Sequence, residues 1–486
     1  MVGSAARATH GLGGGTPWAR LRLALARDRS RLAAARLMLS LTVTLAALNL
    51  AAEALAQTTI GSQGLLQQDT LTGDWGGLRT RLVNSGFTFA LQQQSEFWVN
   101  TLGGFSRGGA ADGLLTLSLA VDLDKAVGWK GGSLFASGFQ IEGVGPTPLR
   151  VGALQLVSNI EATQSTKLYD LWFEQQMFGG KFSLRFGQEG ANDELMLSQN
   201  AELYLNSSFG FPPLMALDLP SGGPNYPLAT PFARAKYQPN DEITLIGAVF
   251  NGDPAPPGSG DPQLLDRHGT AFRLDDHTLS FAELWYAPGF LAKIGLPATY
   301  KVGTWVATGP FADPLYDTAG LTLANPASSG VPFQHATDHA FYAVVDQTLW
   351  KKPGTDTQGI SAFLQVMTAP DDRNLSSLFI AGGFNWNGPL PGRSSDIAGI
   401  AATFAGIGTA ARQFSEDLIF YAGTGVAYST GETVIEATYK VQLAPWLFVQ
   451  PDLQYVVNPG TGIPTAQSAV PLKNALVFGV RLAVSF

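Results

Sequence analysis

Polar side chains alternate with large apolar ones in two neighbouring stretches of the chain, and their types and spacing could do chemistry. In an extended segment such alternation places the polar residues on one face. The two sets are Asp170, Trp172, Glu174 and Gln176 in the first stretch and Lys181, Ser183 and Arg185 in the second. Facing acids, bases and an indole ring can bind a small polar molecule through hydrogen bonds and stacking. They can equally brace the surface on which they lie with ion pairs, and the residues alone leave both interpretations open.

Histidine and acidic residues recur in the chain, but their spacing does not indicate an active site. His335 and His339 lie four residues apart, and on an extended segment this spacing does not bring two ligands together as a helix would. The sequence has no phosphate-binding P-loop and no cysteine. The alternatives are a hydrolase assembled only in space and a calcium site at Asn251, Asp253 and Asp261. We predict a protein without catalysis, metal or cofactor.

The N-terminus has the three parts of a secretory signal peptide. An arginine-rich region precedes an apolar run from Leu37 to Ala52, which is followed by Ala54-Leu55-Ala56. The run is shorter than the about 20 residues of a membrane-spanning helix, which favours a signal peptide over 1–56 and not an anchor. The remaining chain has a formal net charge of −13, because seven of the 30 basic and two of the 38 acidic residues lie in 1–56. This acidic balance argues against nucleic-acid binding.

After residue 57 apolar and polar residues alternate with a period of two, which is typical of β-strands with two different faces. The clearest case is the end of the chain, whose last residue is aromatic. One face of this segment is wholly apolar and consists of Leu476, Phe478, Val480, Leu482, Val484 and Phe486. The other face is small or polar. Such a strand fits a transmembrane barrel with lipid outside and water inside.

Sixteen segments of this kind can be counted, each bounded by Gly, Pro, Asn or Asp. They span 86–100, 113–124, 132–144, 166–177, 181–188, 230–237, 241–251, 277–288, 298–308, 338–350, 358–369, 376–386, 396–406, 431–443, 446–457 and 473–486. Short and long connections mostly alternate between them, the long ones including 145–165, 189–229, 252–276 and 309–337. The exception is 370–375, which is short. An even strand number with short turns at one end and long loops at the other predicts an all-β outer-membrane barrel enclosing an aqueous channel.

A secreted soluble β-sandwich or β-helix would also show alternation, but its outward faces should carry charge. Residues 476–486 of the final segment carry a single charged residue, Arg481, which favours the barrel. We therefore divide the chain into a signal peptide (1–56), an N-terminal periplasmic segment (57–85) and an outer-membrane β-barrel (86–486). Pro451 is unexpected within its segment, because proline cannot donate a hydrogen bond to a neighbouring strand.

Several stretches resemble the OprB-type carbohydrate-selective porins. Gly73-Asp74-Trp75-Gly76-Gly77-Leu78-Arg79 resembles that family's GDWGGxR signature. Further matches follow in the family's order and span 206–213, 226–231, 249–254, 431–436 and 450–455. The segments 309–337 and 388–430 match nothing diagnostic, and the basic N-terminal region is unusually long.

The resemblance implies a passive pore that lets glucose and other sugars cross the outer membrane of a Gram-negative bacterium. It implies a monomer or homotrimer in outer-membrane lipid, without catalysis, cofactor or energy coupling. A general or anion-selective diffusion porin of similar architecture is the alternative, and the charge of −13 argues against anions.

A sugar is neutral and rich in hydroxyl groups, so a pore that favours it needs hydrogen-bonding groups and aromatic surface, whereas rings of one charge select ions. The connection 189–229 is the expected constriction, because a long loop without structure of its own is usually functional and the resemblance supports an inward fold. A lid packed outside is the alternative. We predict nine sugar-binding residues at the constriction: Trp172, Glu174, Arg185, Glu189, Asp193, Asn206, Arg234, Asp452 and Gln454.

Overall fold

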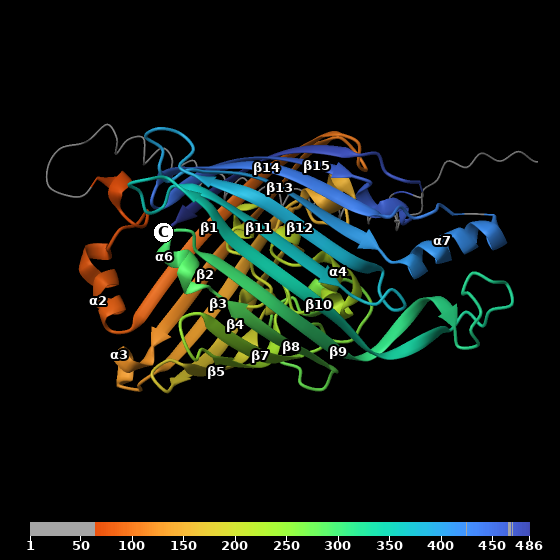
Figure 1. Ribbon diagram of the computed structural model, residues 1–486, viewed down its shortest axis with the longest axis horizontal. Helices are drawn as coiled ribbons and strands as arrows, with labels where there is room; N and C mark the ends of the chain where they lie inside the picture. Colours follow the sequence, from red (N-terminus) through yellow and green to blue (C-terminus); the bar gives the residue numbers. More distant parts are fainter. Residues whose placement is uncertain (1–63, 424, 465–467, 469) are drawn as a thin grey trace, which may run out of the picture.

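A computed structural model describes residues 64–486 with the exception of 424, 465–467 and 469. The predicted signal peptide lies outside the described residues. Sixteen antiparallel strands form one closed barrel, in which each strand pairs with its neighbours in sequence and β1 pairs with β16 (Figure 1). In the described part of the chain no helix is long and apolar enough to cross a membrane. The predicted fold class and strand number are confirmed.

The strands differ in length, and two neighbouring ones reach 20 residues. They are β1 (Phe87–Leu102), β2 (Gly108–Asp122), β3 (Gly132–Val144), β4 (Ser165–Met177), β5 (Phe182–Glu189), β6 (Thr230–Tyr237), β7 (Ile243–Asn251), β8 (Thr278–Tyr286), β9 (Ala298–Asp317), β10 (Pro332–Lys351), β11 (Gly359–Thr368), β12 (Ser376–Asn387), β13 (Ile397–Ile407), β14 (Gly431–Ala444), β15 (Leu447–Val457) and β16 (Ala475–Ser485).

Helices lie in the connections and in the segment before β1. The α-helices are α2 (Leu78–Asn84), α3 (Leu123–Val127), α4 (Pro213–Asp218), α5 (Pro262–Leu265), α6 (Gly289–Lys293) and α7 (Thr409–Ala422). Single turns of 3-10 or π type are η1 (Leu65–Gln67), η2 (Trp75–Gly77), η3 (Thr147–Val151), η4 (Ala191–Asp193), η5 (Ala201–Leu203), η6 (Ser207–Phe209), η7 (Pro220–Gly222) and η8 (Pro459–Gly462). Figure 1 shows α2, α3, α6 and the C-terminus at one end of the barrel, with α7 at the other end.

The two faces of each strand follow from the alternation in the sequence. On β16, Phe478 and Val480 are 47% and 45% exposed on the outer side, whereas Arg481 between β15 and β1 is 6% exposed on the inner side. Large apolar side chains that remain exposed in a water-soluble protein would be unfavourable, but lipid covers them on a barrel. The apolar outer face predicted for this strand is therefore confirmed.

One predicted loop is wrong. Residues 309–337 are mostly strand, because β9 and β10 continue as a long hairpin that ends in a turn at 318–331. Pro310 and Pro314 obscured the alternation of this segment in the sequence. Both prolines fall where the pairing with β10 is irregular, between the pairs Thr308–Thr337 and Asp317–Pro332, so neither has to donate to a regular ladder. Helix α7, in the connection before β14, was not predicted.

Two local irregularities interrupt the regular pairing of neighbouring strands. A bulge in the β3–β4 pairing, between Ala136 and Gly138, turns Tyr169 inward. Strict alternation with Asp170 and Trp172 would place this side chain on the opposite, outward face. In the hairpin of β14 and β15, Pro451 is exposed on the outer face. The regular pairing there skips from Thr438–Asp452 to Val441–Val449, because proline offers no donor.

The segment before β1 is attached to the end of the chain. The guanidinium of Arg79 donates to the carbonyl of Phe486 at 2.9 Å and lies over the ring of Trp75 at 4.4 Å. Asp74 holds the start of α2 by accepting from the main-chain N–H of Thr80 at 2.7 Å. Gly77 has a φ of 89°, which only glycine adopts without strain. The motif at 73–79 thus fastens both ends of the described chain to one rim of the barrel.

Candidate functional site: the loops inside the barrel

The connection 190–229, hereafter the large inner loop, lies inside the barrel. Its residues Phe209, Leu214 and Met215 are buried in an apolar core together with inward-facing side chains of β6 to β13, such as Trp305 and Phe363. The rings of Phe209 and Phe363 meet edge to face at 5.9 Å. Figure 1 shows α4 of this loop within the ring of strands. The predicted inward fold is confirmed, and the alternative of a lid packed outside is wrong.

This core changes the expected character of the interior. Alternation alone predicted a wall that is small or polar towards the channel. The inner faces of β6 to β13 instead carry large apolar residues. The large inner loop packs on these residues and shields them from water in the channel. The open passage is consequently narrower than a sixteen-stranded ring would leave.

A second connection, 145–164, also lies inside and is called the small inner loop. It had not been singled out as a constriction. It contacts the large inner loop through the main chain: the N–H of Asn159 donates to the carbonyl of Leu205 at 2.7 Å, and the N–H of Ser207 donates to the carbonyl of Leu156 at 3.0 Å. The hydroxyl of Tyr226 also donates to the carbonyl of Ile160 at 2.8 Å. The two loops therefore form one continuous structure.

Beside the large inner loop, three neighbouring strands bring acids and bases together. Arg185 of β5 forms ion pairs with Glu174 of β4 at 2.7 Å and with Glu189 at 3.1 Å. Glu174 and Arg185 are direct partners in the β4–β5 pairing, which sets this distance. The side chain of Arg185 is 17% exposed, so it keeps access to water within the barrel.

The same ion pairs continue onto β6 and the loop. Arg234 of β6 is bonded to Glu174 at 2.9 Å and to Glu194 of the large inner loop at 2.7 Å, and Lys236 reaches Glu194 at 2.9 Å. Burial alone would raise the pKa of Glu194. The positive charges of Arg234, Lys236 and Arg185 outweigh this effect and leave that pKa below its ordinary value. We call these six residues the charge cluster: Glu174, Arg185, Glu189, Glu194, Arg234 and Lys236.

Aromatic rings border the charge cluster. The guanidinium of Arg185 lies 4.0 Å from the ring centre of Trp172, and Phe135 stacks beside that ring at 5.2 Å. On the other side, Lys236 and Lys301 lie 5.2 and 4.2 Å from the ring of Trp285. Cations held over indole faces keep both groups in place.

Three of the predicted residues lie elsewhere, where the large inner loop meets β15. The side-chain amide of Asn206 donates to Gln454 of β15 at 3.1 Å, and Gln454 donates to Asp452 at 3.1 Å. All three are buried. Their observed contacts hold the loop against the wall, and a solute could reach them only if the loop moved.

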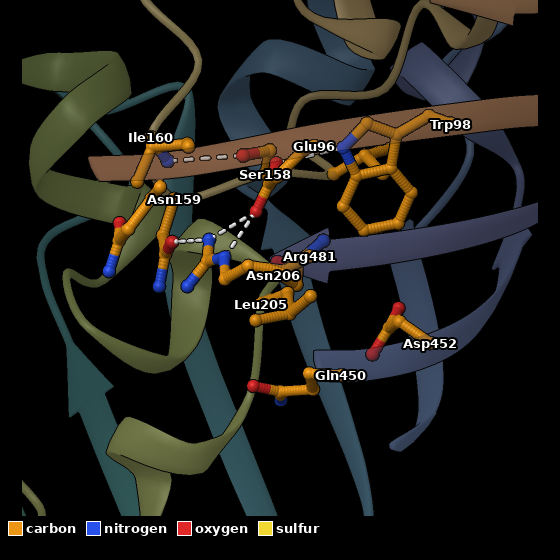
Figure 2. Close-up of polar contacts among 12 residues, drawn as sticks. Glu96, Trp98, Ser158, Asn159, Ile160, Leu205, Asn206, Gln450, Asp452 and Arg481 are labelled. Atoms are coloured by element: carbon orange, nitrogen blue, oxygen red, sulfur yellow. Dashed lines mark hydrogen bonds and ion pairs between the residues drawn. The ribbon is translucent and has the colours of Figure 1, made fainter. Parts of the chain in front are cut away.

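The small inner loop is bound at the place where the barrel closes. Arg481 of β16 forms an ion pair with Glu96 of β1 and donates to the side chain of Asn159 at 2.5 Å. The indole N–H of Trp98 donates to the other oxygen of Glu96 at 2.8 Å. Figure 2 shows these side chains converging from the two strands and the loop. The pairing of the first and last strands, which any closed barrel requires, was the signal in the sequence that could have brought Glu96 and Arg481 together.

Of the nine predicted residues, the structure brings five into one group: Trp172, Glu174, Arg185, Glu189 and Arg234. Asp193 lies next to that group on the large inner loop, where its carboxylate accepts from the N–H of Gly190 at 3.0 Å while its side chain remains exposed. Among the described residues, no group of three or more histidine, aspartate or glutamate side chains is placed to hold a metal ion.

Comparison with known proteins identifies the family. The model of the carbohydrate-selective porin family OprB matches residues 106–486, which is most of the chain. The chain belongs to the OprB family. The matched range begins just before β2, so the N-terminal motif at 73–79 lies outside it.

Two relatives of this OprB-family chain carry the name porin. It is 24% identical to Porin B of Pseudomonas aeruginosa over 449 residues, covering 86% of this chain and 91% of that protein. It is 23% identical to the putative porin QuiX of Acinetobacter baylyi, covering 83% and 93%. The high-pH structure of Pseudomonas putida OprB superposes with a TM-score of 0.77 at 22% identity, covering 86% of this chain and 99% of that one, and so shares its fold. The chain is an outer-membrane carbohydrate porin of the OprB family.

Proposed function

We propose that this porin conducts neutral monosaccharides such as glucose down their concentration gradient. The sugar contacts Trp172 and the partly exposed members of the charge cluster, Arg185, Glu194 and Lys236. The buried members, Glu174, Glu189 and Arg234, hold these side chains in place. The observation that carries the proposal is the balance of charge in the cluster. Three carboxylates are paired with three cations beside an indole ring. A ring of one sign would favour ions, whereas paired charges present donors and acceptors with little net field.

The geometry suits a hydroxyl-rich solute. The acids and bases of the cluster already orient one another, so hydrogen bonds to sugar hydroxyls need no rearrangement of the wall. The ring of Trp172 offers apolar surface to the C–H face of a pyranose. Asn206, Asp452 and Gln454, which we also predicted at the constriction, would act indirectly by holding the loop.

Liposome swelling tests the proposed selectivity. Purified protein in liposomes is exposed to glucose and, in parallel, to two ions of similar size. These are gluconate, which is negatively charged, and protonated glucosamine, which is positively charged. We expect glucose to enter faster than either ion. Equal rates for the three solutes would favour a general diffusion porin, and faster entry of gluconate would favour an anion-selective one; either result would contradict the proposal.

The absence of cysteine from the chain allows a direct map of the passage. We expect Asp193→Cys to react with a membrane-impermeant thiol reagent and to lose glucose flux on modification. The matched control is Asp241→Cys, on the exposed β6–β7 turn, which should be modified with little loss of flux. Modification at both positions without any effect on flux would remove Asp193 from the passage.

Three further proposals concern processing, topology and assembly. We propose that residues 1–56 are removed on export, which N-terminal sequencing of the outer-membrane protein would test. We also propose that the segment before β1 lies in the periplasm, on the side of the short turns. We propose that the barrel assembles as a homotrimer, one of the two states that the family resemblance implies. Mass measurement in detergent or lipid nanodiscs distinguishes it from the monomer.

A further inference from the structure

The main chain of residues 196–206, the middle of the large inner loop, is bound by side chains of the barrel wall. Three wall carboxylates on separate strands accept hydrogen bonds from its N–H groups. Glu283 of β8 accepts from Met196 at 2.9 Å, and Asp346 of β10 accepts from Gln199 at 3.2 Å and from Asn200 at 3.1 Å. These carboxylates are almost fully buried.

The third carboxylate, Glu436 of β14, holds the far end of the segment. One of its oxygens accepts from the N–H of Leu205 at 2.6 Å, and the other accepts from the N–H of Asn206 at 3.0 Å. Glu436 has no exposed surface. We call Glu283, Asp346 and Glu436 the amide clamps.

Wall strands next to those of the clamps supply the complementary donors. Lys301 of β9 donates to the carbonyl of Leu197 at 2.7 Å, Asn385 of β12 to that of Asn200 at 2.6 Å, and Gln450 of β15 to that of Leu203 at 2.8 Å. Acceptors and donors on the wall thus match the N–H and carbonyl groups of the loop along its course. Because these contacts are made to main-chain atoms, most of them do not depend on the identity of the loop side chains.

A separate carboxylate binds the small inner loop in the same way. Glu432 of β14 accepts from the N–H groups of Leu154 and Gln155 at 2.9 and 2.8 Å, and from that of Gly460 at 2.8 Å. Glu432 is also completely buried. The two inner loops are therefore attached to one strand, β14, through two carboxylates four residues apart.

We propose that the amide clamps are positioning residues that set the size limit of the porin. They fix how far the large inner loop reaches into the barrel, and so fix the width left for the solute. These buried carboxylates should therefore act on permeating solutes less than their formal negative charge suggests, because they accept hydrogen bonds from loop amides. A hydrogen bond from an N–H to a buried carboxylate is stronger than one between neutral groups, which suits a loop that must stay in place while solute passes.

The test compares solute sizes, which separates it from the proposed sugar contacts. Glu436→Gln and Asp346→Asn keep the shape of the side chain but replace an acceptor oxygen by a donor N–H₂. Uptake of glucose, a disaccharide and a trisaccharide is measured by liposome swelling for each variant. We expect the ratio of disaccharide to glucose entry to rise about threefold or more, and we expect exchange of the Leu205 and Asn206 amides in Glu436→Gln to be about tenfold faster.

Glu202→Gln is the matched control, since Glu202 lies exposed in the same segment and is not one of the clamps. Its size ratio should equal that of the wild type. Retention of the folded barrel is checked by the shift of the unheated protein on a denaturing gel. Faster amide exchange with an unchanged size ratio would overturn the proposal, as would unchanged exchange and unchanged ratio in both clamp variants. If one variant fails to fold, the other decides, because the clamps lie on different strands. If the wild type does not prefer glucose over ions, the proposed function is contradicted. The size ratio would still test the amide clamps.

Discussion

Arg481 and Glu96 form a buried ion pair between the last and the first strand of the barrel, where they are direct partners in the β1–β16 pairing. Arg481 also donates to Asn159 of the small inner loop, so the closure of the barrel and the position of that loop depend on one side chain (Figure 2). The chain must bring its two ends together before this contact can form. We infer that the small inner loop adopts its final position only once the barrel has closed.

Removal of Arg481 should therefore weaken both structures. We expect Arg481→Met to lower the free energy of unfolding by about 3 kcal/mol or more, because it leaves the buried carboxylate of Glu96 without its cation. Denaturant unfolding of the detergent-solubilised protein measures this loss. The double variant Glu96→Gln/Arg481→Met should be more stable than Arg481→Met alone. A double variant as unstable as the sum of the two single ones would show that the pair does not act as a unit.

Arg185 is expected to matter for flux more than for folding. Arg185→Ala removes the guanidinium over Trp172 and leaves Glu174 paired only with Arg234. We expect glucose entry to fall several-fold and cation permeation to rise, as seen by swelling and by reversal potentials in a salt gradient. Arg185→Lys keeps the positive charge but cannot reach Glu174 and Glu189 with two separate nitrogens, as a guanidinium does. This variant should recover part of the glucose flux. Normal glucose entry through Arg185→Ala would exclude this residue from the sugar path.

The indole ring of Trp172 can be tested independently of charge. Trp172→Phe keeps an aromatic surface and should retain most of the preference for glucose, whereas Trp172→Ala should lose it while small ions still permeate. Competition between glucose and a linear polyol of similar mass gives the readout, because the polyol lacks a flat ring face. Equal selectivity in the phenylalanine and alanine variants would mean that stacking on Trp172 does not contribute.

The barrel could be predicted from the sequence because its determinants are local. Alternation with a period of two fixes the faces of each strand, and the turn residues fix its ends, so most strand boundaries agree within two or three residues. The prediction failed where prolines obscured the alternation, as in β9, and where a bulge turned a side chain, as at Tyr169. Both failures concern interruptions of a regular pattern.

The interior was only partly predictable. Glu174 and Arg185 lie on consecutive strands, so their meeting follows from the hairpin between them. The contacts of Glu436 with Leu205 and Asn206 join residues more than 200 positions apart, and nothing in the local pattern specifies them. A loop that lies across the barrel bonds to many strands at once. Its course therefore depends on the whole ring and not on any one segment.

The carboxyl group of Glu161 should make the small inner loop sensitive to pH. Burial raises its pKa to about 7, although the N–H and hydroxyl of Thr147 donate to it and partly offset the burial. Because the folded loop favours the protonated form, the loop should be most stable below about pH 4.5 and should lose up to about 3 kcal/mol as the pH rises to about 7. Hydrogen exchange of residues 147–161 at pH 5 and pH 8, corrected for intrinsic rates, measures this change. Glu161→Gln should abolish the difference, because its amide stays neutral at both values; a variant with the same pH dependence as the wild type would assign the effect to another group, such as the nearby Glu96.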